Sequence, residues 1–298
     1  MTVETLKPHH EPATAAGLGH ERPGARILIA TGGAPHSGKA VALGGEVAQT
    51  AGGRVTILMV ARGPDEAARA QTVLAEARAR LADSVGHVET KLRLGDPAEE
   101  IIAEAAEGDY DLLVMGERPA HRLIARVRGT VRERVLGHIR SAVLIAKGEA
   151  RHIHHILLCD SGAHSPSALS HFIRNFADWL HEDVEVTVLH VMSQISAAPG
   201  LPHTGQLHAD AELLIREQTP EGEWLERDIE VLGGEYVRPR AQIRHGLVVD
   251  EILNEAREGN YDLVVIGAHR GEGWQRFLLT DVAREIILKA DRPVLVVH

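Results

Sequence analysis

Short apolar runs rich in Val, Ile and Leu alternate with longer amphipathic stretches along the whole chain. Such runs are typical of strands in a parallel sheet whose two faces are both covered by helices. The pattern predicts strands at residues 26–30, 55–61, 88–94, 111–115 and 142–146, and then at 154–159, 184–191, 236–245, 262–266 and 293–297. It predicts helices at residues 37–51, 64–84, 97–107 and 130–138, and then at 167–180, 209–232, 248–258 and 281–289.

Strands that alternate with helices of this length indicate right-handed βαβ crossovers. We therefore expect an α/β fold composed of two tandem, Rossmann-like domains. Each domain would be a doubly wound, five-stranded parallel sheet with helices on both faces.

An internal repeat supports this division. Residues 95–116 read GDPAEEIIAEAAEGDYDLLVMG and residues 246–267 read GLVVDEILNEAREGNYDLVVIG, so they align without a gap and 12 of 22 positions are identical. Their offset is 151 residues, whereas the first strands, which contain Ile27 and Ile156, are offset by 129. The difference of 22 residues predicts a longer loop in the second copy, near residues 193–209, which are rich in Pro, Gly, Ser and His.

The repeat divides the chain into three parts. We expect a disordered N-terminal tail at residues 1–24, a first domain at 25–149 and a second domain at 150–298. The tail is polar and lacks the apolar segment of a signal peptide.

Composition narrows the classes of function. The 298 residues carry a net charge of -10, which disfavours binding to nucleic acid or anionic lipid. Only 3% of the residues are aromatic, so a protein that binds stacked bases is not expected. The single cysteine, Cys159, excludes an intrachain disulfide, and its predicted position in a buried strand is typical of an inert thiol. No apolar run is long enough to span a membrane. We expect a cytoplasmic protein that neither inserts into membranes nor binds nucleic acid.

In doubly wound sheets, ligands bind at the carboxyl ends of the strands. The loop after the first strand, TGGAPHSGKA from Thr31 to Ala40, nearly matches the phosphate-loop pattern G-x-x-x-x-G-K-[ST]. However, Ala40 has no hydroxyl for magnesium, and Pro35 removes a backbone N–H donor. A glycine-rich turn between strand and helix is therefore the preferred interpretation.

The ends of the fourth and fifth strands carry a family resemblance. Each copy ends its fourth strand with Asp, four further residues and Gly, at 111–116 and 262–267, and each finishes with an apolar strand. In these features the chain resembles the universal stress protein family in a tandem two-copy form. The resemblance covers about residues 26–147 and 154–298. It implies that the last strands of the two copies pair into an internal pseudo-dimer, which covers exposed edges.

ATP-binding members of that family carry G-x2-G-x9-G-[ST] after the fourth strand. The glycines let backbone N–H groups approach phosphates, and the following helix N-terminus favours their charge. The first copy keeps Gly116 and Gly129-Thr130 at this spacing but has Pro119 at the second glycine. With neighbouring residues, the resemblance gives these candidate nucleotide-binding residues: Thr31, Gly32, Gly116, Arg118, Arg128, Gly129 and Thr130.

The second copy departs further from the family pattern. Gly267 is present, but Arg270 stands at the second glycine, and Thr280-Asp281 replaces the Gly-[Ser/Thr] pair. The Asp281 carboxylate would repel a phosphate. ATP-binding members also carry an aspartate after strand one, and only the second copy has it, as Asp160. The second copy therefore has only an incomplete set of equivalents to the candidate nucleotide-binding residues, namely Asp160, Gly267 and Arg270. We expect ATP or AMP to bind in the first copy. We expect no metal beyond the Mg that accompanies a nucleotide.

Basic residues gather near the same loop of the first copy. Guanidinium groups suit phosphate oxygens, whereas the alternative is a solvated surface whose arginines pair with carboxylates. The second copy has only Arg270, Arg276 and Arg284 there, so the asymmetry favours the first copy. The first-copy arginines are Arg118, Arg122, Arg126, Arg128, Arg132 and Arg134.

Histidines provide no clear metal site. His152 and His154 would share a strand face, a spacing compatible with two metal ligands, but exposed linker histidines are the preferred interpretation. His190 and His245 are predicted to be satisfied residues within strands.

Three interpretations of function follow. The first is a stress-response or regulatory protein that binds an adenine nucleotide in the first domain and is at most a slow ATPase. The second is a nucleotide-free scaffold for protein interactions, favoured by Pro119, Arg270 and Asp281. The third is an ATP-using enzyme of the adenine-nucleotide α-hydrolase class, suggested by Thr31-Gly32-Gly33, although no catalytic constellation accompanies it. A homodimer and an unidentified protein partner are expected in addition.

Overall fold

The computed structural model describes residues 24–117, 130–148, 152–159, 172, 176, 183–192, 210–232, 239–267 and 281–297. The predicted tail, except Gly24, and the predicted loop near 193–209 lie outside these residues. Of the predicted helix at 167–180, only Phe172 and Phe176 are described, and both are helical and buried.

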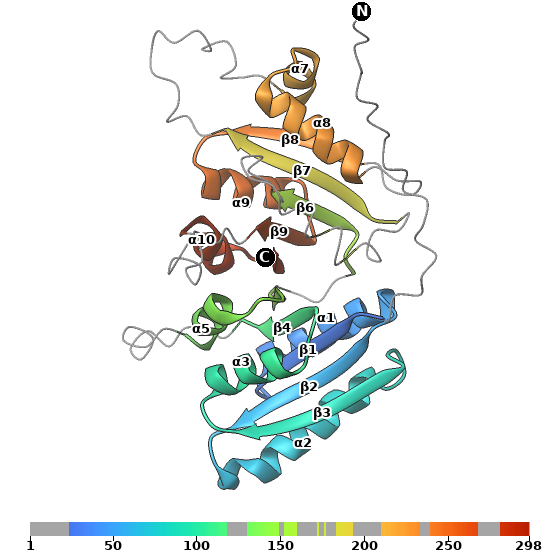
Figure 1. The fold of residues 1–298 in the computed structure, drawn as a ribbon, viewed down its shortest axis with the longest axis vertical. Coiled ribbons are helices and arrows are strands. Elements are labelled where there is room, and N and C mark those ends of the chain that lie inside the picture. The colour runs from blue at the N-terminus through green and yellow to red at the C-terminus, as the bar shows by residue number, and fades with distance from the viewer. Residues whose placement is uncertain are drawn as a thin grey trace, which may run out of the picture.

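Among the described residues, strands and helices alternate throughout the first half of the chain and from Pro220 onward in the second half (Figure 1). The first half contains β1 (Arg26–Thr31), α1 (Pro35–Thr50), β2 (Arg54–Ala61), α2 (Pro64–Leu81), β3 (His87–Leu94), α3 (Pro97–Glu107), β4 (Leu112–Gly116), α5 (Val131–His138) and β5 (Ala142–Ala146). The second half contains β6 (His155–Cys159), β7 (Glu185–Met192), α7 (Ala211–Arg216), α8 (Pro220–Leu232), β8 (Arg240–His245), α9 (Val248–Glu258), β9 (Leu263–Gly267), α10 (Asp281–Lys289) and β10 (Val294–Val297).

All described strands belong to one ten-stranded sheet, in the order β3-β2-β1-β4-β5-β10-β9-β6-β7-β8. Every neighbouring pair is parallel except β5 and β10, which are antiparallel. Each half therefore supplies a five-stranded parallel sheet, and the two last strands join them. The prediction of two doubly wound sheets paired as an internal pseudo-dimer is confirmed.

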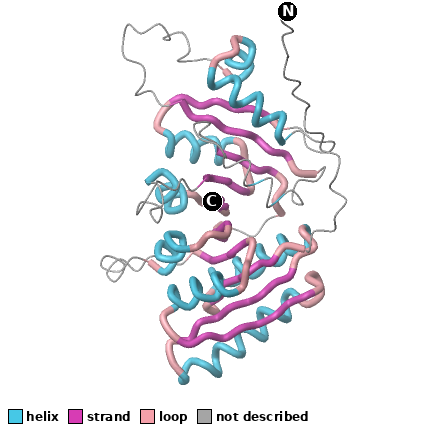
Figure 2. The backbone as a smooth tube through the Cα atoms, viewed as in Figure 1, coloured by secondary structure: helices cyan, strands magenta, loops and turns pink. Residues whose placement is uncertain are grey.

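Helices cover both faces of the sheet (Figure 2). Side chains of α1, α2, α7 and α8 pack in one apolar core on one face, and those of α3, α5, α9 and α10 pack in a second core on the other. The central strands β1, β4, β5, β6, β9 and β10 lie between these cores and are almost wholly apolar, because neither face meets water.

One helix prediction was wrong. The amphipathic stretch at 209–232 forms two helices, α7 and α8, that are separated at residues 217–219. Pro220 lacks the N–H that would continue the helical hydrogen bonds, and Gln218 adopts a φ of 51°. The Thr219 hydroxyl accepts a hydrogen bond of 3.1 Å from the N–H of Gly222, so it caps the new helix.

The joint between the halves is centred on two leucines. Leu144 and Leu295 face each other across the antiparallel β5–β10 pair and are both fully buried. Their numbers differ by 151, the offset of the repeat, so they occupy equivalent positions in the two copies. On the neighbouring helices, Glu133 and Arg284 are also equivalent, and a carboxylate oxygen and Nη2 of this pair lie 2.9 Å apart.

Each copy also repeats a carboxylate that fastens its first strand. An oxygen of Asp111 accepts a hydrogen bond of 2.8 Å from the N–H of Arg26. The equivalent Asp262 accepts bonds of 3.0 Å from the N–H groups of His154 and His155. These aspartates, which marked the family resemblance in sequence, tie the start of the fourth strand to the start of the first.

A repeated ionic network connects the third strand to the following helix. Arg93 forms ion pairs with Glu100, Glu104 and Glu107 at 2.7, 3.0 and 2.9 Å. In the second copy, Arg244 pairs with the glutamates 151 residues further on, namely Glu255 at 2.6 Å, Glu258, and Glu251 at a longer 4.0 Å.

A tyrosine completes each network, and it is buried in the first copy and partly buried in the second. The Tyr110 hydroxyl donates to Glu104 at 2.8 Å, and the Tyr261 hydroxyl donates to Glu255 at 3.1 Å. Burial raises the pKa of Tyr110, and it raises the pKa of Tyr261 to about 12. Both hydroxyls therefore stay protonated and act as donors at neutral pH.

Glu104 is the most deeply buried carboxylate of the first network. Burial alone would raise the pKa of its carboxyl, but hydrogen bonds from Lys91, Tyr110 and Arg93 outweigh burial and lower it. A lowered pKa means that the native protein holds the ionised form more strongly than the unfolded chain does. This contribution to stability is present above about pH 4.5, the ordinary pKa of the group, and is lost as the pH falls through the native pKa.

Leu144→Ala should lower the free energy of unfolding by about 2–5 kcal/mol, because it leaves a cavity in the closed joint between the halves. Urea denaturation followed by circular dichroism would measure this loss. Leu94→Ala, at a leucine that is 53% exposed, should cost less than about 1 kcal/mol. Equal losses for the two variants would contradict the central position of the joint.

Glu104→Gln should destabilise the protein at pH 7, and the difference from the unmodified chain should shrink as the pH falls below about 4.5. Urea titrations across this pH range provide the measurement. Glu76→Gln, at an exposed position of α2, should change stability by no more than about 0.5 kcal/mol at any pH. A difference for Glu104→Gln that does not change with pH would show that its carboxyl does not titrate as described.

Candidate functional site

The carboxyl ends of β1 and β4 lie side by side, because these strands pair in parallel with Ala30 opposite Met115. The loop after β1 therefore meets the end of β4. A Cβ atom on Gly116 would lie 2.2 Å from the carbonyl oxygen of His36, at the start of α1. Gly116 thus permits close packing between the end of β4 and the start of α1, independently of any ligand.

The loop after β1 is a tightly bonded turn. The Gly32 N–H donates to the Ser37 hydroxyl at 3.0 Å, and the Gly33 N–H donates to the Thr31 hydroxyl at 3.4 Å. Gly33 has a φ of 72°, which glycine adopts at little cost. Lys39 donates to the carbonyl oxygen of Gly148, beyond β5. The predicted glycine-rich turn between strand and helix is what the structure contains.

A capping box begins α5. The Thr130 hydroxyl accepts from the Glu133 N–H at 3.2 Å, and the Glu133 carboxylate accepts from the Thr130 N–H at 2.9 Å. Burial would raise the pKa of Glu133, but hydrogen bonds from the Thr130 N–H and from Arg284 outweigh it and lower the value. The charged carboxylate is favourable there, since the positive end of a helix dipole attracts an anion.

The two described arginines of the basic cluster have different partners. Arg134 forms ion pairs with Asp96 at 2.8 Å and Glu99 at 3.2 Å, as the solvated-surface alternative predicts. Arg132 reaches Glu117, directly after β4, with Nη1 3.4 Å from a carboxylate oxygen. This contact brings the start of α5 to the end of β4.

Sequence reasoning missed Glu117 and Lys147. The Lys147 ammonium, 1% exposed, lies 2.9 Å from a Glu117 carboxylate oxygen and 2.9 Å from the Ala290 carbonyl oxygen, to which it donates. Burial lowers the pKa of Lys147, although Glu117 acts in the opposite direction. The available signal was a lysine that directly continues the wholly apolar strand β5.

Several predicted site residues lie outside the described part of the chain, namely Arg118, Arg128, Gly129, Asp160 and Arg270. Among the others, Thr31 ends β1, Gly32 lies in the turn that follows, and Gly116 ends β4 beside them. Thr130 caps α5, and Gly267 ends β9 in the second copy. The carboxyl end of the sheet in the first copy thus brings Thr31, Gly32 and Gly116 together.

His152, His154 and Cys159 are not among the residues at the carboxyl ends of β1 and β4. His152 Nδ1 lies 3.2 Å from a Glu46 carboxylate oxygen, and the ring centroids of His152 and His154 are 6.2 Å apart. Within the described residues, no group of three or more His, Cys, Asp or Glu is arranged to hold a metal ion. Cys159 was predicted to be buried, but it is partly exposed, because it ends β6 beyond the three buried residues of that strand.

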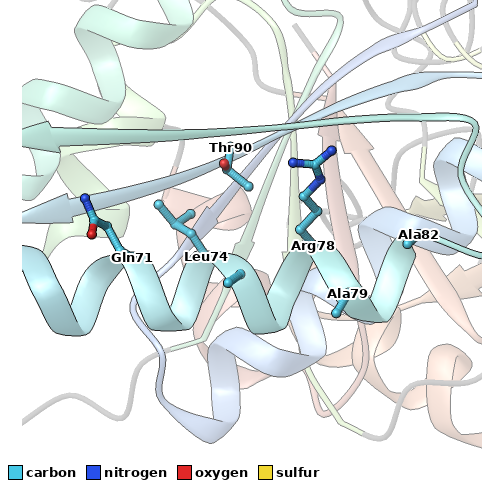
Figure 3. A pocket seen from close by; sticks show the side chains of 7 residues that line it. Gln71, Leu74, Arg78, Ala79, Ala82 and Thr90 are labelled. Carbon is cyan, nitrogen blue, oxygen red and sulfur yellow. The ribbon is translucent and has the colours of Figure 1, made fainter.

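A groove of about 450 Å³ lies between α2 and β3 (Figure 3). Leu74 and Arg78 of α2 rise toward Thr90 of the strand. This groove lies along an edge strand and not at the carboxyl ends of β1 and β4, so it is separate from the candidate site. Its lining residues are Gln71, Leu74, Ala75, Arg78, Ala79, Ala82 and Thr90.

Among the helices that are described, none is long and apolar enough to cross a membrane.

Two Rossmann-like α/β units, fused in tandem and joined through their last strands, define the class of protein. A model of the universal stress protein family matches residues 25–147 and 152–298. The chain therefore belongs to the universal stress protein family, with two copies of the family domain.

Individual relatives agree with this assignment. A universal stress protein of Methanocaldococcus jannaschii is 29% identical over 155 residues, which cover 52% of this chain and 86% of that protein. The structure is also similar to a universal stress protein from Archaeoglobus fulgidus, with a TM-score of 0.66, 20% identity, and coverage of 91% of this chain and 95% of that one. A putative universal stress protein from Pseudomonas aeruginosa has a TM-score of 0.63 and 17% identity, with 92% and 93% covered.

Gly116→Ala should destabilise the protein by more than about 1 kcal/mol, because the new methyl group meets the His36 backbone and a loop must move. A thermal unfolding scan would detect the change as a fall in Tm of several degrees. Gly86→Ala is the matched control, because a Cβ at Gly86 has no neighbour within 4 Å. A variant at Gly116 as stable as the control would contradict the close packing of the end of β4 against the start of α1.

Proposed function

We propose that this protein is a regulatory, stress-response member of its family that binds an adenine nucleotide, ATP or AMP, in the first copy. The second copy would act as its structural partner and not as a second nucleotide site. One observation carries the proposal, namely that the equivalent positions Thr130 and Asp281, at the start of the two helices, differ in charge. α5 begins after the uncharged pair Gly129-Thr130, whereas α10 begins with the carboxylate of Asp281.

This difference matters because phosphates bind favourably at helix N-termini, where free N–H groups and the helix dipole attract negative charge. A carboxylate in the first position already supplies that charge and repels a phosphate. The aspartates that both copies share, Asp111 and Asp262, tie the first strand to the start of the fourth strand, at the end opposite to the carboxyl ends. The copies therefore differ at the carboxyl ends of their strands, where a ligand is expected to bind.

A nucleotide-free scaffold is the second candidate function. The observation that favours it is the capping box, in which both the N–H and the hydroxyl of Thr130 already have partners within the chain. A nucleotide phosphate would have to share these groups or replace Glu133. In this alternative, the protein acts only through contacts with other proteins.

We further propose a cytoplasmic protein without an enzymatic reaction beyond slow ATP hydrolysis, with Mg only as a companion of the nucleotide. Any homodimer of the whole chain would form through a surface other than the β5 and β10 edges. These two edges already pair with each other within one chain.

Nucleotide content is the first test of the proposal. Denaturing the purified chain and analysing the released small molecules by mass spectrometry should identify an adenine nucleotide, and calorimetry with ATP and AMP should give about one equivalent. Gly129→Asp should weaken binding more than about tenfold, because it places a carboxylate at the start of α5.

Thr280→Asp is the matched control, since it makes the equivalent change in the second copy and should leave binding unchanged. Absence of released nucleotide, together with no binding heat up to millimolar ATP, would refute the nucleotide proposal and favour the scaffold. Equal effects of the two substitutions would contradict the assignment to the first copy.

A further inference from the structure

Three charged side chains meet where β4 and β5 end, beside the joint between the two copies. Glu117 follows β4, Lys147 follows β5, and Arg132 lies in the first turn of α5. The Glu117 carboxylate contacts the Lys147 ammonium at 2.9 Å and Arg132 Nη1 at 3.4 Å. The Lys147 side chain is 1% exposed and that of Arg132 is 11% exposed, so both cations are largely withdrawn from water.

The cluster has an excess of positive charge. Among the described residues, Glu117 is the only carboxylate that forms an ion pair with either cation. Asp291 also acts on the Lys147 charge from a distance, but Asp291 forms its own ion pair with Arg292, so the direct contacts supply one negative charge for two positive charges. Buried charge without a partner is unfavourable, and an additional anion would balance the cluster.

One N–H group of Arg132 also lacks an acceptor among the described residues. Its Nε is buried and, within the part of the chain that the structure describes, has no hydrogen-bond partner. A buried donor without an acceptor costs free energy that an incoming oxygen atom recovers. The contact between Arg132 and Glu117, at 3.4 Å, is longer than the approximately 2.7–2.9 Å of a strong charged hydrogen bond. Glu117 therefore binds one side of the guanidinium only weakly, and Nε has no acceptor among the described residues.

We propose that Arg132, supported by Lys147, forms the phosphoryl-binding part of the nucleotide site in the first copy. This inference rests on the proposed function and adds residues to it. A phosphoryl oxygen that accepts from Arg132 Nε satisfies the buried donor, and its charge balances the cluster. Guanidinium groups hold phosphoryl oxygens in this way through neighbouring N–H groups, and the start of α5 adds its dipole.

The second copy lacks the whole cluster. At the offset of 151 residues, Glu117, Arg132 and Lys147 correspond to Ala268, Ala283 and His298. Phosphoryl binding is therefore confined to the first copy, in agreement with the carboxylate at the start of α10.

The full-length chain provides the test, with three probes that separate the parts of the ligand. Adenosine probes the nucleoside part, pyrophosphate probes the phosphoryl part, and ATP probes both. Arg132→Gln should weaken ATP and pyrophosphate binding about tenfold or more and leave adenosine binding unchanged, as measured by calorimetry and by the rise of Tm with each probe.

Two further variants distinguish a loss of phosphoryl binding from a loss of folding. Glu117→Gln removes the only carboxylate of the cluster, so it should strengthen ATP and pyrophosphate binding by at least about threefold. Arg134→Gln is the matched control, because Arg134 lies on the same helix but pairs with Asp96 and Glu99. It should leave the affinity for all three probes unchanged. The opposite directions expected for Arg132→Gln and Glu117→Gln exclude a general loss of folding as the explanation.

The outcomes for the two proposals are distinct. If the unmodified chain binds ATP and Arg132→Gln binds it equally well, the phosphoryl assignment is overturned and the nucleotide proposal stands. If pyrophosphate binds through Arg132 but neither adenosine nor ATP binds, the phosphoryl assignment stands and the nucleotide proposal fails. If no probe binds to the unmodified chain or to Glu117→Gln, both are overturned.

Discussion

Antiparallel pairing of β5 with β10 is the interaction on which the rest of the architecture depends. It converts two five-stranded sheets into one ten-stranded sheet and covers two edges that would otherwise be open to aggregation. The same pairing places α5 beside α10 and brings the Lys147 ammonium to the Ala290 carbonyl of the second copy. The charged cluster of the first copy is thus built at the joint, and its geometry depends on both halves.

Comparison of the two copies separates structural residues from candidate functional ones. The networks around Arg93 and Arg244 use residues at equivalent positions and similar contacts, so both copies retain what holds the third strand to its helix. The charges at the carboxyl ends of the strands differ completely, as Glu117, Arg132 and Lys147 show. Both copies contain the structural networks, but only the first copy contains the charged cluster. This pattern is expected when one copy binds a ligand and the other supports it.

The sequence predicted the fold well because apolar periodicity reports burial directly. The pairing of the last strands followed from the family resemblance, whereas the break before Pro220 was missed because the apolar pattern continues through it. The charged cluster was less accessible to prediction, because Glu117 and Lys147 become neighbours only when β4 pairs with β5. Arg132 and Arg134 look alike in sequence, yet one is buried beside the candidate site and the other pairs with surface carboxylates.

The Glu133–Arg284 ion pair shows what fusing the two copies makes available. When two identical chains assemble around a two-fold axis, a residue near the axis meets the same residue of the other chain, and a glutamate there would face a glutamate. A fused chain is free of this rule, because each half can change independently of the other. Opposite charges can then meet at the axis, as Glu133 and Arg284 do. Each half is therefore complementary to the other half, and two copies of the same half would bring like charges together at this position.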